Sequence, residues 1–456
     1  MNPKLNALWS WRVRAGQAML AGFAATALSG CDVDSIVELT NPDLITPEVV
    51  ADTANLPIVA NGVVFEFARA YGGEASNAST AGPGLIHLGG LLADEFWHAS
   101  TFSTLDEIDA RRILDTNGEL LIAYRYMQRA RNLAERTAAL FAESPRANSA
   151  QHAEMLSLAG FAYVLFAENF CSGVPFSVTE FSGDIEFGEQ LTTTQTLERA
   201  LAHFDAALAT AGSHQDADMT NLARVGRGRV LLNLGRFDEA PAAVADVPND
   251  FVYSLPFGLP PQPNNAVWYF TNSASRISAA TEEGQNGLRF FARGDSDNTI
   301  DPRVPADSSG DGLGTETPLY SQGLYTGPDS PLPLATGIEA RLIEAEAQLA
   351  GGSSGAYLGS LNDLRSSVGL APLADPGSPT ERVLQFYEER ARWLWITAHR
   401  LGDLRRMVRE YGFAPNEVFP IGNAIQGETY SEDTSLPVPF DERNNPNYSG
   451  ACLDEE

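Results

Sequence analysis

The sequence predicts a mostly α-helical protein interrupted by one long loop-rich region. Apolar residues recur at steps of three and four through three long segments between Leu120 and Ala211, which is the spacing of amphipathic helices. Prolines and glycines crowd residues 249–334, where no long helix is expected. With 456 residues, 44% of them hydrophobic, the chain is long enough to bury a large core.

Residues 1–30 are typical of a lipoprotein signal peptide. Basic residues precede an apolar stretch, Ala15 to Leu28, that is shorter than the roughly 20 residues needed to span a membrane. The stretch ends in Leu28-Ser29-Gly30-Cys31, a lipobox in which a thiol directly follows two small residues. We therefore expect Cys31 to be acylated and to anchor the chain to a membrane. The polar, acidic segment 31–46 is expected to form a tether.

The charge of the chain argues against several functions. It has 30 basic and 59 acidic residues, a net charge of −29. Nucleic acid is not an expected ligand, because its binding depends on Lys and Arg that neutralise phosphates. Lys4, in the predicted signal peptide, is the only lysine. The mature chain therefore has no lysine for a P-loop, a Schiff base or a Ser-Lys dyad.

The helical segments of the first half follow one another from residue 120. Their apolar stripes run from Leu120 to Phe141, from Met155 to Phe170 and from Leu197 to Ala211. The next segment, 223–247, combines a glycine-containing helix, the turn Leu234-Gly235-Arg236-Phe237 and a second helix. It resembles a tetratricopeptide unit, in which small residues let two antiparallel helices approach closely. We expect such hairpins within residues 47–248.

The loop-rich region, 249–334, carries a group of aromatic residues that argue against disorder and for a packed, ligand-facing layer. These residues are Trp268, Tyr269, Phe270, Phe290 and Phe291. Helical periodicity returns within residues 335–410. A proline- and asparagine-rich tail occupies residues 411–456.

The segment Glu389–Arg406, ERARWLWITAHRLGDLRR, resembles the signature helix of SusD/RagB-like nutrient-binding outer-membrane lipoproteins. Ala398 stands where that family commonly has glycine. Further motifs of the family occur in the expected order: Asp301-Pro302-Arg303, GIEARLIEAEAQL at 337–349, LNDLRSSVGLAPL at 361–373, Leu436-Pro437-Val438-Pro439, Glu442 and Asn445-Pro446. The resemblance implies a SusD-like binding domain over residues 47–456.

The resemblance also implies a function. It predicts a surface-exposed outer-membrane lipoprotein that captures oligosaccharides, or peptides, and delivers them to a SusC-like TonB-dependent transporter. Two other classes stay open from the residues alone. One is a helical-repeat scaffold that holds a protein partner, and the other is a polysaccharide-cleaving hydrolase with paired carboxylates.

Spacing within the signature segment favours an architectural role. Periodicity from Glu381 to Arg409 predicts one continuous helix with an apolar stripe on one side. Glu388 and Arg392 are four residues apart, and so are His399 and Asp403, so each pair is expected to meet on the helix surface. A His-Asp pair alone lacks a nucleophile or a third metal ligand. We therefore expect a buried polar network that ties this helix to its neighbours.

Aromatic side chains are the candidate ligand contacts, because the CH faces of a sugar stack on rings while its hydroxyls reach polar groups. The candidates are Phe96, Trp97 and Phe102 in the first half and Trp268 and Tyr269 in the loop-rich region. No catalytic site is predicted. Gly351-Gly352-Ser353-Ser354-Gly355 matches a nucleophile pattern by letter, but it follows a predicted helix where that chemistry requires a strand.

The metal and cysteine content completes the expectations. No zinc motif is present and no cofactor is expected, but the carboxylates of Asp295, Asp297, Asp301, Asp307 and Asp311 leave a structural calcium open against a solvated acidic loop. With Cys31 used for lipidation, Cys171 and Cys452 remain as an even pair and a candidate disulfide. Two unpaired thiols are the alternative.

Overall fold

The computed structural model describes residues 53–75, 81–180, 183–258, 263–291 and 301–453. The predicted signal peptide, Cys31 and the predicted tether lie outside these residues. Within the described part of the chain, no helix combines the length and the apolar character that crossing a membrane requires.

The first half is built from helices, which confirms the predicted fold class. The three periodic segments form α7, α8 and α9, and each of these helices begins after a residue whose side chain caps its first turn. The helical elements of this half are η1 (Thr53–Asn55), α4 (Leu56–Gly72), α5 (Leu85–Leu92), α6 (Ser103–Asp109), α7 (Gly118–Ala142), α8 (Ala150–Asn169), α9 (Thr193–His214), α10 (Ala217–Asn233) and α11 (Ala240–Val244).

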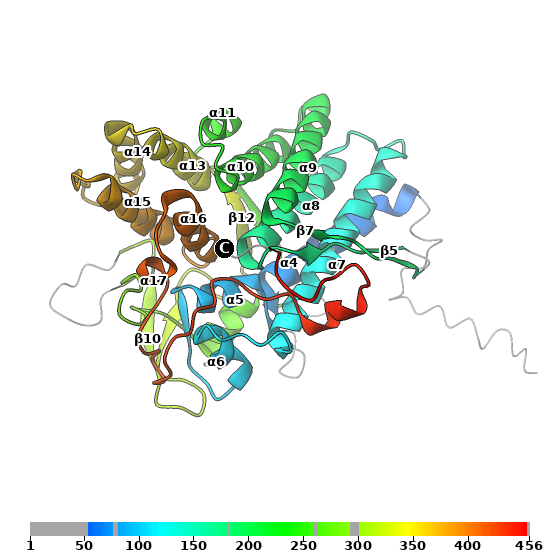
Figure 1. The fold of residues 1–456 in the computed structure, drawn as a ribbon. Helices are drawn as coiled ribbons and strands as arrows, with labels where there is room; N and C mark the ends of the chain where they lie inside the picture. The colour runs from blue at the N-terminus through cyan, green and yellow to red at the C-terminus, as the bar shows by residue number, and fades with distance from the viewer. Residues whose placement is uncertain (1–52, 76–80, 181–182, 259–262, 292–300, 454–456) are drawn as a thin grey trace, which may run out of the picture. The chain divides into compact units, whose positions relative to one another are not determined.

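Helix α8 lies between α7 and α9 (Figure 1) and is buried along nearly its whole length. Glycines allow the neighbouring helices to approach it closely. A Cβ on Gly160 of α8 would lie 2.8 Å from the ring of Phe204 on α9, and a Cβ on Gly226 of α10 would lie 2.2 Å from the same ring. Gly228 leaves similar room for Val244 of α11. The segment 223–247 therefore forms the close helical hairpin that its small residues predict.

Short elements occupy residues 249–334, where the proline content disfavours long ones. They are β8 (Val252–Leu255), α12 (Ala266–Trp268), the π-helix η2 (Tyr269–Ser273), β9 (Ile277–Ala279), β10 (Ala306–Asp311), β11 (Pro318–Gln322) and β12 (Leu332–Thr336). The strands of the first half are equally short: β1 (Gly73–Glu74), β2 (Gly82–Pro83), β3 (Phe96–His98), β4 (Val174–Pro175), β5 (Val178–Thr179), β6 (Ile185–Glu186) and β7 (Gln190–Leu191). Among the described residues, the six strand pairs are all antiparallel: β1–β2, β3–β9, β4–β7, β5–β6, β8–β12 and β10–β11.

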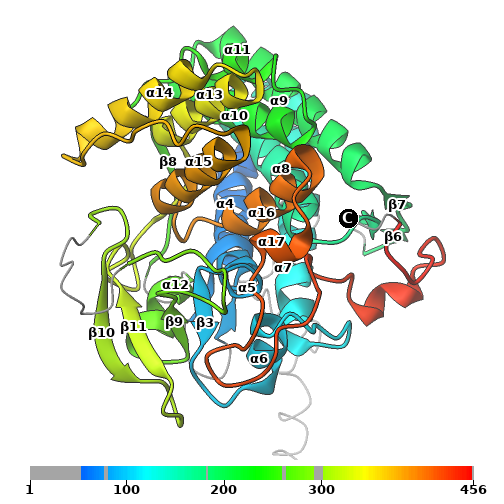
Figure 2. The same ribbon diagram turned by 60° about the vertical axis from the view of Figure 1, so that its left-hand side comes forward.

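The last third returns to helices. They are α13 (Gly337–Ala350), α14 (Ser354–Ser367), α15 (Pro379–Trp393), α16 (Arg400–Tyr411), α17 (Pro415–Val418) and the 3₁₀ helix η3 (Phe440–Asn444). Figure 2 shows α13 and α14 beside α10 and α11, with α15 and α16 below them. Ser353 precedes α14 and follows α13, so the Gly351–Gly355 segment connects two helices, as its context predicts.

The expectation of one continuous helix over 381–409 is wrong, because the chain breaks between α15 and α16. Ile396 and Ala398 both have positive φ, 57° and 56°, which no helix interior tolerates. Tertiary contacts hold the break. Glu95 accepts the Ile396 N–H at 2.9 Å, and the Tyr71 hydroxyl donates to the Thr397 carbonyl at 2.7 Å. Helical periodicity on both sides of the break conceals it in the sequence.

The predicted polar network around this break is present and buried. Arg390 of α15 donates to Asp403 of α16 at 2.9 Å, and Arg406 bridges Asp403 at 2.8 Å and Glu346 of α13 at 2.6 Å. The Glu388–Arg392 pair forms as predicted, at 2.8 Å. The His399–Asp403 side-chain pair does not form, because the helix starts only at Arg400, and His399 Nε2 instead lies 3.0 Å from Glu339.

The C-terminal tail lies along the first helical half. Leu436 pairs with Phe170 in a parallel bridge, and the Leu436 N–H donates to the Asn169 carbonyl at 2.8 Å. A disulfide joins Cys171 and Cys452, with Cα atoms 5.8 Å apart and a sequence separation of 281. These are the two cysteines that the cysteine count leaves for a pair. The red tail in Figures 1 and 2 therefore runs beside α7 and the β4–β7 strands.

Candidate ligand-binding site

Three segments that are far apart in sequence bring the predicted aromatic residues into one region. Strand β3 pairs with β9, with Trp97 opposite Ser278. The Ser278 hydroxyl in turn accepts the backbone N–H of Tyr320 on β11 at 2.8 Å. Figure 2 shows β3, β9, β11 and β10 side by side. These strands, the loop after β3 and the π-helix η2 together form one layer, which we call the aromatic region.

Two of the five candidates lie inside this layer. Trp97 is 1% exposed, and its indole N–H donates to the Pro318 carbonyl at 2.9 Å. Phe96 is fully buried, and its ring stacks on that of His87 with centroids 5.8 Å apart. In this conformation neither ring has an exposed face for a ligand. Direct ligand contact by either side chain stays a prediction.

The other three candidates reach the surface at least in part. Phe102 is 38% exposed, and the guanidinium of Arg276 lies 4.5 Å from its ring centroid. Arg276 also lies 5.7 Å from the ring of Phe270, which contacts Tyr269 edge to face at 5.3 Å. Trp268 and Tyr269 are half-buried. The structure thus joins Phe102 and Tyr269 through Arg276 and Phe270.

Sequence reasoning missed Tyr320 and gave Phe291 no role of its own. Tyr320 is half-buried and lies between Trp97, at 5.8 Å, and Phe291, at 5.4 Å. Phe291 contacts Trp395 at 6.4 Å, so the four rings form a row from β3 to the α15–α16 break. No motif marks Tyr320. The available signal was the position of Tyr320 directly after Leu319, because consecutive residues of a strand point to opposite faces.

Polar groups beside the row are held in fixed positions. Gln426 donates to the His98 carbonyl at 2.7 Å, and the His98 ring lies 2.8 Å from the Ser100 hydroxyl. Burial lowers the pKa of His98 to about 4, so this imidazole is neutral at neutral pH. Behind it, Asp109 accepts the His98 N–H at 2.7 Å, and burial raises the pKa of Asp109 to about 8. These hydrogen bonds fix the backbone and the side chain of His98, next to Trp97 on β3.

A pocket of about 470 Å³ lies next to Phe291 and is lined by Arg289, Asp301, Arg303 and Arg392 among others. Its charges are engaged with one another: Arg303 donates to Asp301 at 2.6 Å and to Glu389 at 2.6 Å. Asp295 and Asp297, two carboxylates of the possible calcium site, lie outside the described residues. Within the described residues, no cluster of three or more His, Cys, Asp or Glu side chains could hold a metal ion. A structural calcium stays an open alternative to a solvated acidic loop.

Comparison with known proteins gives matches at the level of structure. No protein-family model and no curated protein sequence matches the chain. A SusD-like carbohydrate binding protein from Bacteroides fragilis aligns with a TM-score of 0.65 and 15% identity, over 88% of this chain and 99% of that one. A SusD-like carbohydrate binding protein from Bacteroides vulgatus aligns with a TM-score of 0.62 and 15% identity, over 87% and 97%.

A SusD superfamily protein from Parabacteroides distasonis aligns with a TM-score of 0.60 and 13% identity, over 80% of this chain and 92% of that one. At such identities the likeness establishes fold. The alignments include nearly the whole of each matched chain, so the helical half and the loop-rich region belong to one shared architecture. The chain therefore has the SusD-like fold that its signature segment predicts.

Proposed function

We propose that this protein is a solute-binding lipoprotein of the outer membrane that captures oligosaccharides at the cell surface. It delivers them to a SusC-like TonB-dependent transporter. The observation that carries the proposal is the SusD-like fold, aligned over 88% of the chain with a structure described as a carbohydrate binding protein. The lipobox ending at Cys31 supports a membrane anchor. Peptides are the second ligand class.

The chemistry of the aromatic region supports a glycan ligand. Phe102, Trp268 and Tyr269 offer partly exposed rings on which the CH faces of a sugar can stack. Arg276 lies against Phe102 and can donate to the hydroxyls of a sugar. Binding of this kind requires shape, stacking and hydrogen bonds, and leaves the bound sugar chemically unchanged.

The binding proposal is tested with purified protein, a panel of neutral oligosaccharides and calorimetry. Trp268→Ala and Phe102→Ala should each weaken binding by about 1–3 kcal/mol if the ring stacks on the ligand. Phe440→Ala is the matched control, because Phe440 is also exposed, at 46%, and also lies 4.5 Å from an arginine, Arg443. Equal affinity in all three variants would remove the aromatic region from the proposal.

The delivery role is tested by purification from the native host. A large β-barrel transporter should co-purify with the protein, and the bound glycan should be recovered at its original length. Steady release of reducing ends by the purified protein would instead favour a hydrolase. Recovery of a soluble protein partner without a transporter would favour a scaffold.

The anchor has its own test. Cys31→Ala should abolish labelling by a fatty-acid probe, because it removes the thiol that carries the lipid. Continued labelling of Cys31→Ala would contradict the lipobox. Protease treatment of intact cells checks the surface location, since a surface protein is digested and a periplasmic one is spared.

A further inference from the structure

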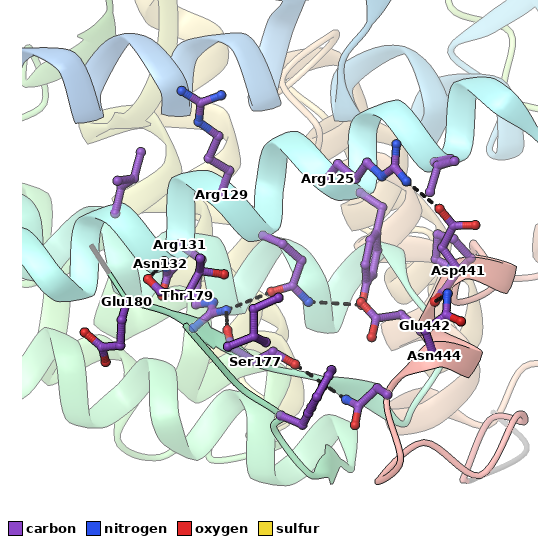
Figure 3. Close-up of a pocket in the computed structure, with 18 of the residues that line it drawn as sticks. Arg125, Arg129, Arg131, Asn132, Ser177, Thr179, Glu180, Asp441, Glu442 and Asn444 are labelled. Carbon is purple, nitrogen blue, oxygen red and sulfur yellow. Dashed lines mark hydrogen bonds and ion pairs between the residues drawn. The ribbon is translucent and has the colours of Figure 1, made fainter. Parts of the chain in front are cut away.

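A groove of about 640 Å³ lies along α7 and shares no lining residue with the aromatic region. Its walls are α7, the segment around β5 and β6, and the C-terminal tail near η3 (Figure 3). Four of the residues that line it are arginines and three are acidic. The whole chain has 30 basic against 59 acidic residues. The groove therefore reverses the charge balance of the protein.

Helical spacing explains why the arginines gather here. Arg125, Arg129, Asn132 and Arg136 fall at steps of four, three and four along α7, so they share one face of the helix. The side chains of Arg125 and Arg129 are 64% and 59% exposed. Figure 3 shows Arg125 extending from α7 toward Asp441 of the tail, and Arg129 extending from α7 toward α4. The sequence pattern contains this stripe, but only the fold reveals the opposing walls.

The walls orient Arg125 and Arg129 without burying these two side chains. Arg125 forms an ion pair with Asp441 in the tail, and Arg129 lies 3.4 Å from Glu66 of α4. Arg136 donates to Glu180 at 2.9 Å. A guanidinium has five N–H donors, so Arg125 and Arg129, each paired with one carboxylate, keep donors for a second anion.

The groove also has apolar and amide surface. Ile185 and Phe187, on the strand-loop wall, are 55% and 44% exposed and so offer apolar surface to a ligand. Gln128, Asn132 and Asn444 add amide groups to the lining. A ring for stacking and guanidinium groups for carboxylates therefore line the same groove.

We propose that this groove is a second ligand site, which binds oligosaccharides that carry carboxylate groups, such as uronic-acid units. The proposal rests on the proposed function only in taking the ligand to be a glycan. Carboxylates pair with the guanidinium groups of Arg125 and Arg129, and one sugar face packs on Phe187. An acidic ligand thereby gains a local site on a chain whose net charge of −29 repels it elsewhere.

The backbone of the groove disfavours an extended peptide as occupant. A peptide that adds a strand needs free N–H and C=O groups on a sheet edge. The Ser177 carbonyl accepts from Arg131 at 2.5 Å, and the Thr179 carbonyl accepts from Asn132 at 3.1 Å and from Arg136 at 2.5 Å. The side chains of α7 thus already donate to the carbonyls on this edge, so a peptide strand cannot pair with them. A glycan can still be bound through the side chains that line the groove.

The test compares two forms of one probe by calorimetry on purified protein. Tetragalacturonate should bind roughly tenfold or more tightly than its fully methyl-esterified form, which has the same sugar faces without the charges. High salt should weaken binding of the charged form and leave the ester unaffected. Equal affinities for the two forms, or no binding of the charged form, would overturn the proposal.

Variants locate the binding. Arg125→Gln with Arg129→Gln should abolish the preference for the charged probe, and Phe187→Ala should weaken both probes. Arg224→Gln is the matched control, since Arg224 is a surface arginine paired with Asp246 at 2.9 Å on another face. Loss of binding in the control to the same extent, or tetraglutamate binding as tightly as tetragalacturonate, would overturn the assignment.

The two sites are distinguished by crossing the variants. Trp268→Ala should leave tetragalacturonate binding unchanged, and the arginine variant should leave neutral glycan binding unchanged. If no neutral glycan binds but the arginines still control tetragalacturonate binding, the proposed function of the aromatic region fails and the groove site stands. If tetragalacturonate binding depends on Trp268, the groove assignment fails.

Discussion

Two groups of arginines in this protein do opposite things. Arg229, Arg390 and Arg406 are about 1% exposed and pair with buried acids of other helices. Arg125 and Arg129 on α7 are more than half exposed and pair with Asp441 and Glu66 at a groove. Arginine therefore forms buried ion pairs between helices in one region and stays accessible to a ligand in the other. The difference lies in desolvation, because a buried charge must keep its partner while an exposed one has water as an alternative.

The largest expected effect comes from breaking an interior pair. Arg229→Met should lower the free energy of unfolding by about 3–5 kcal/mol, because it leaves Glu168 charged and buried with Asn233 as a neutral partner. Arg129→Met should cost less than about 1 kcal/mol. Urea unfolding measures both. Adding Glu168→Leu to Arg229→Met should restore much of the loss, and equal losses for Arg229→Met and Arg129→Met would abolish the contrast.

The disulfide attaches the C-terminal tail, which forms one wall of the groove, to the end of α8. Replacing Cys171 and Cys452 by Ser should lower stability by up to roughly 5 kcal/mol in the chain-entropy model, with smaller losses common. The replacement should also weaken binding in the groove, because the tail that the disulfide holds contains Asp441, which orients Arg125. Non-reducing mass spectrometry of the mature protein checks the bridge itself, and two alkylatable thiols after denaturation would contradict it.

Buried carboxyl groups give the interior of the protein a pH-dependent stability. Burial raises the pKa of Glu95 and of Asp109 to about 8, against about 4 in an unfolded chain. Between these values unfolding releases a proton from each group, so the free energy of unfolding falls as pH rises. The slope is about 1.4 kcal/mol per pH unit for each group.

The useful window for this measurement is pH 6.5 to 8. Burial lowers the pKa of His87 to about 3 and that of His98 to about 4, so these groups act in the opposite direction only below about 6.5. Glu95→Gln with Asp109→Asn should flatten the slope in this window, leaving the part due to Glu283, whose pKa burial also raises. An unchanged slope in thermal or urea unfolding would show that these carboxyls do not cause it.

The smallest effect concerns the backbone that carries the interior network. Ala398 has a φ of 56°, where alanine pays about 1–2 kcal/mol and glycine does not. Ala398→Gly should therefore stabilise the protein by about 0.5–1 kcal/mol after the entropy cost of glycine. Ala139→Gly, at an exposed position inside α7, should instead destabilise it by about 1 kcal/mol. Destabilisation by both variants would show that the break at 394–399 is not strained at Ala398.

The amino-acid sequence determined the helical half of this protein. Periodicities of three and four residues predicted α7, α8 and α9, and small residues at 226 and 228 predicted a close hairpin, because these signals are local along the chain. The signature segment predicted the SusD-like fold and an interior polar network. The cysteine count singled out the pair that the structure bridges.

Only the tertiary structure decided which side chains face solvent. Trp97 and Trp268 are equally plausible ligand contacts in sequence, but β9 and β11 cover the first and leave the second half-exposed. The break at Ile396 depends on Glu95 and Tyr71, about 300 residues away, and the groove depends on a tail that the disulfide returns to α7. Local patterns fix how a segment folds, whereas burial is set by neighbours that the sequence does not place.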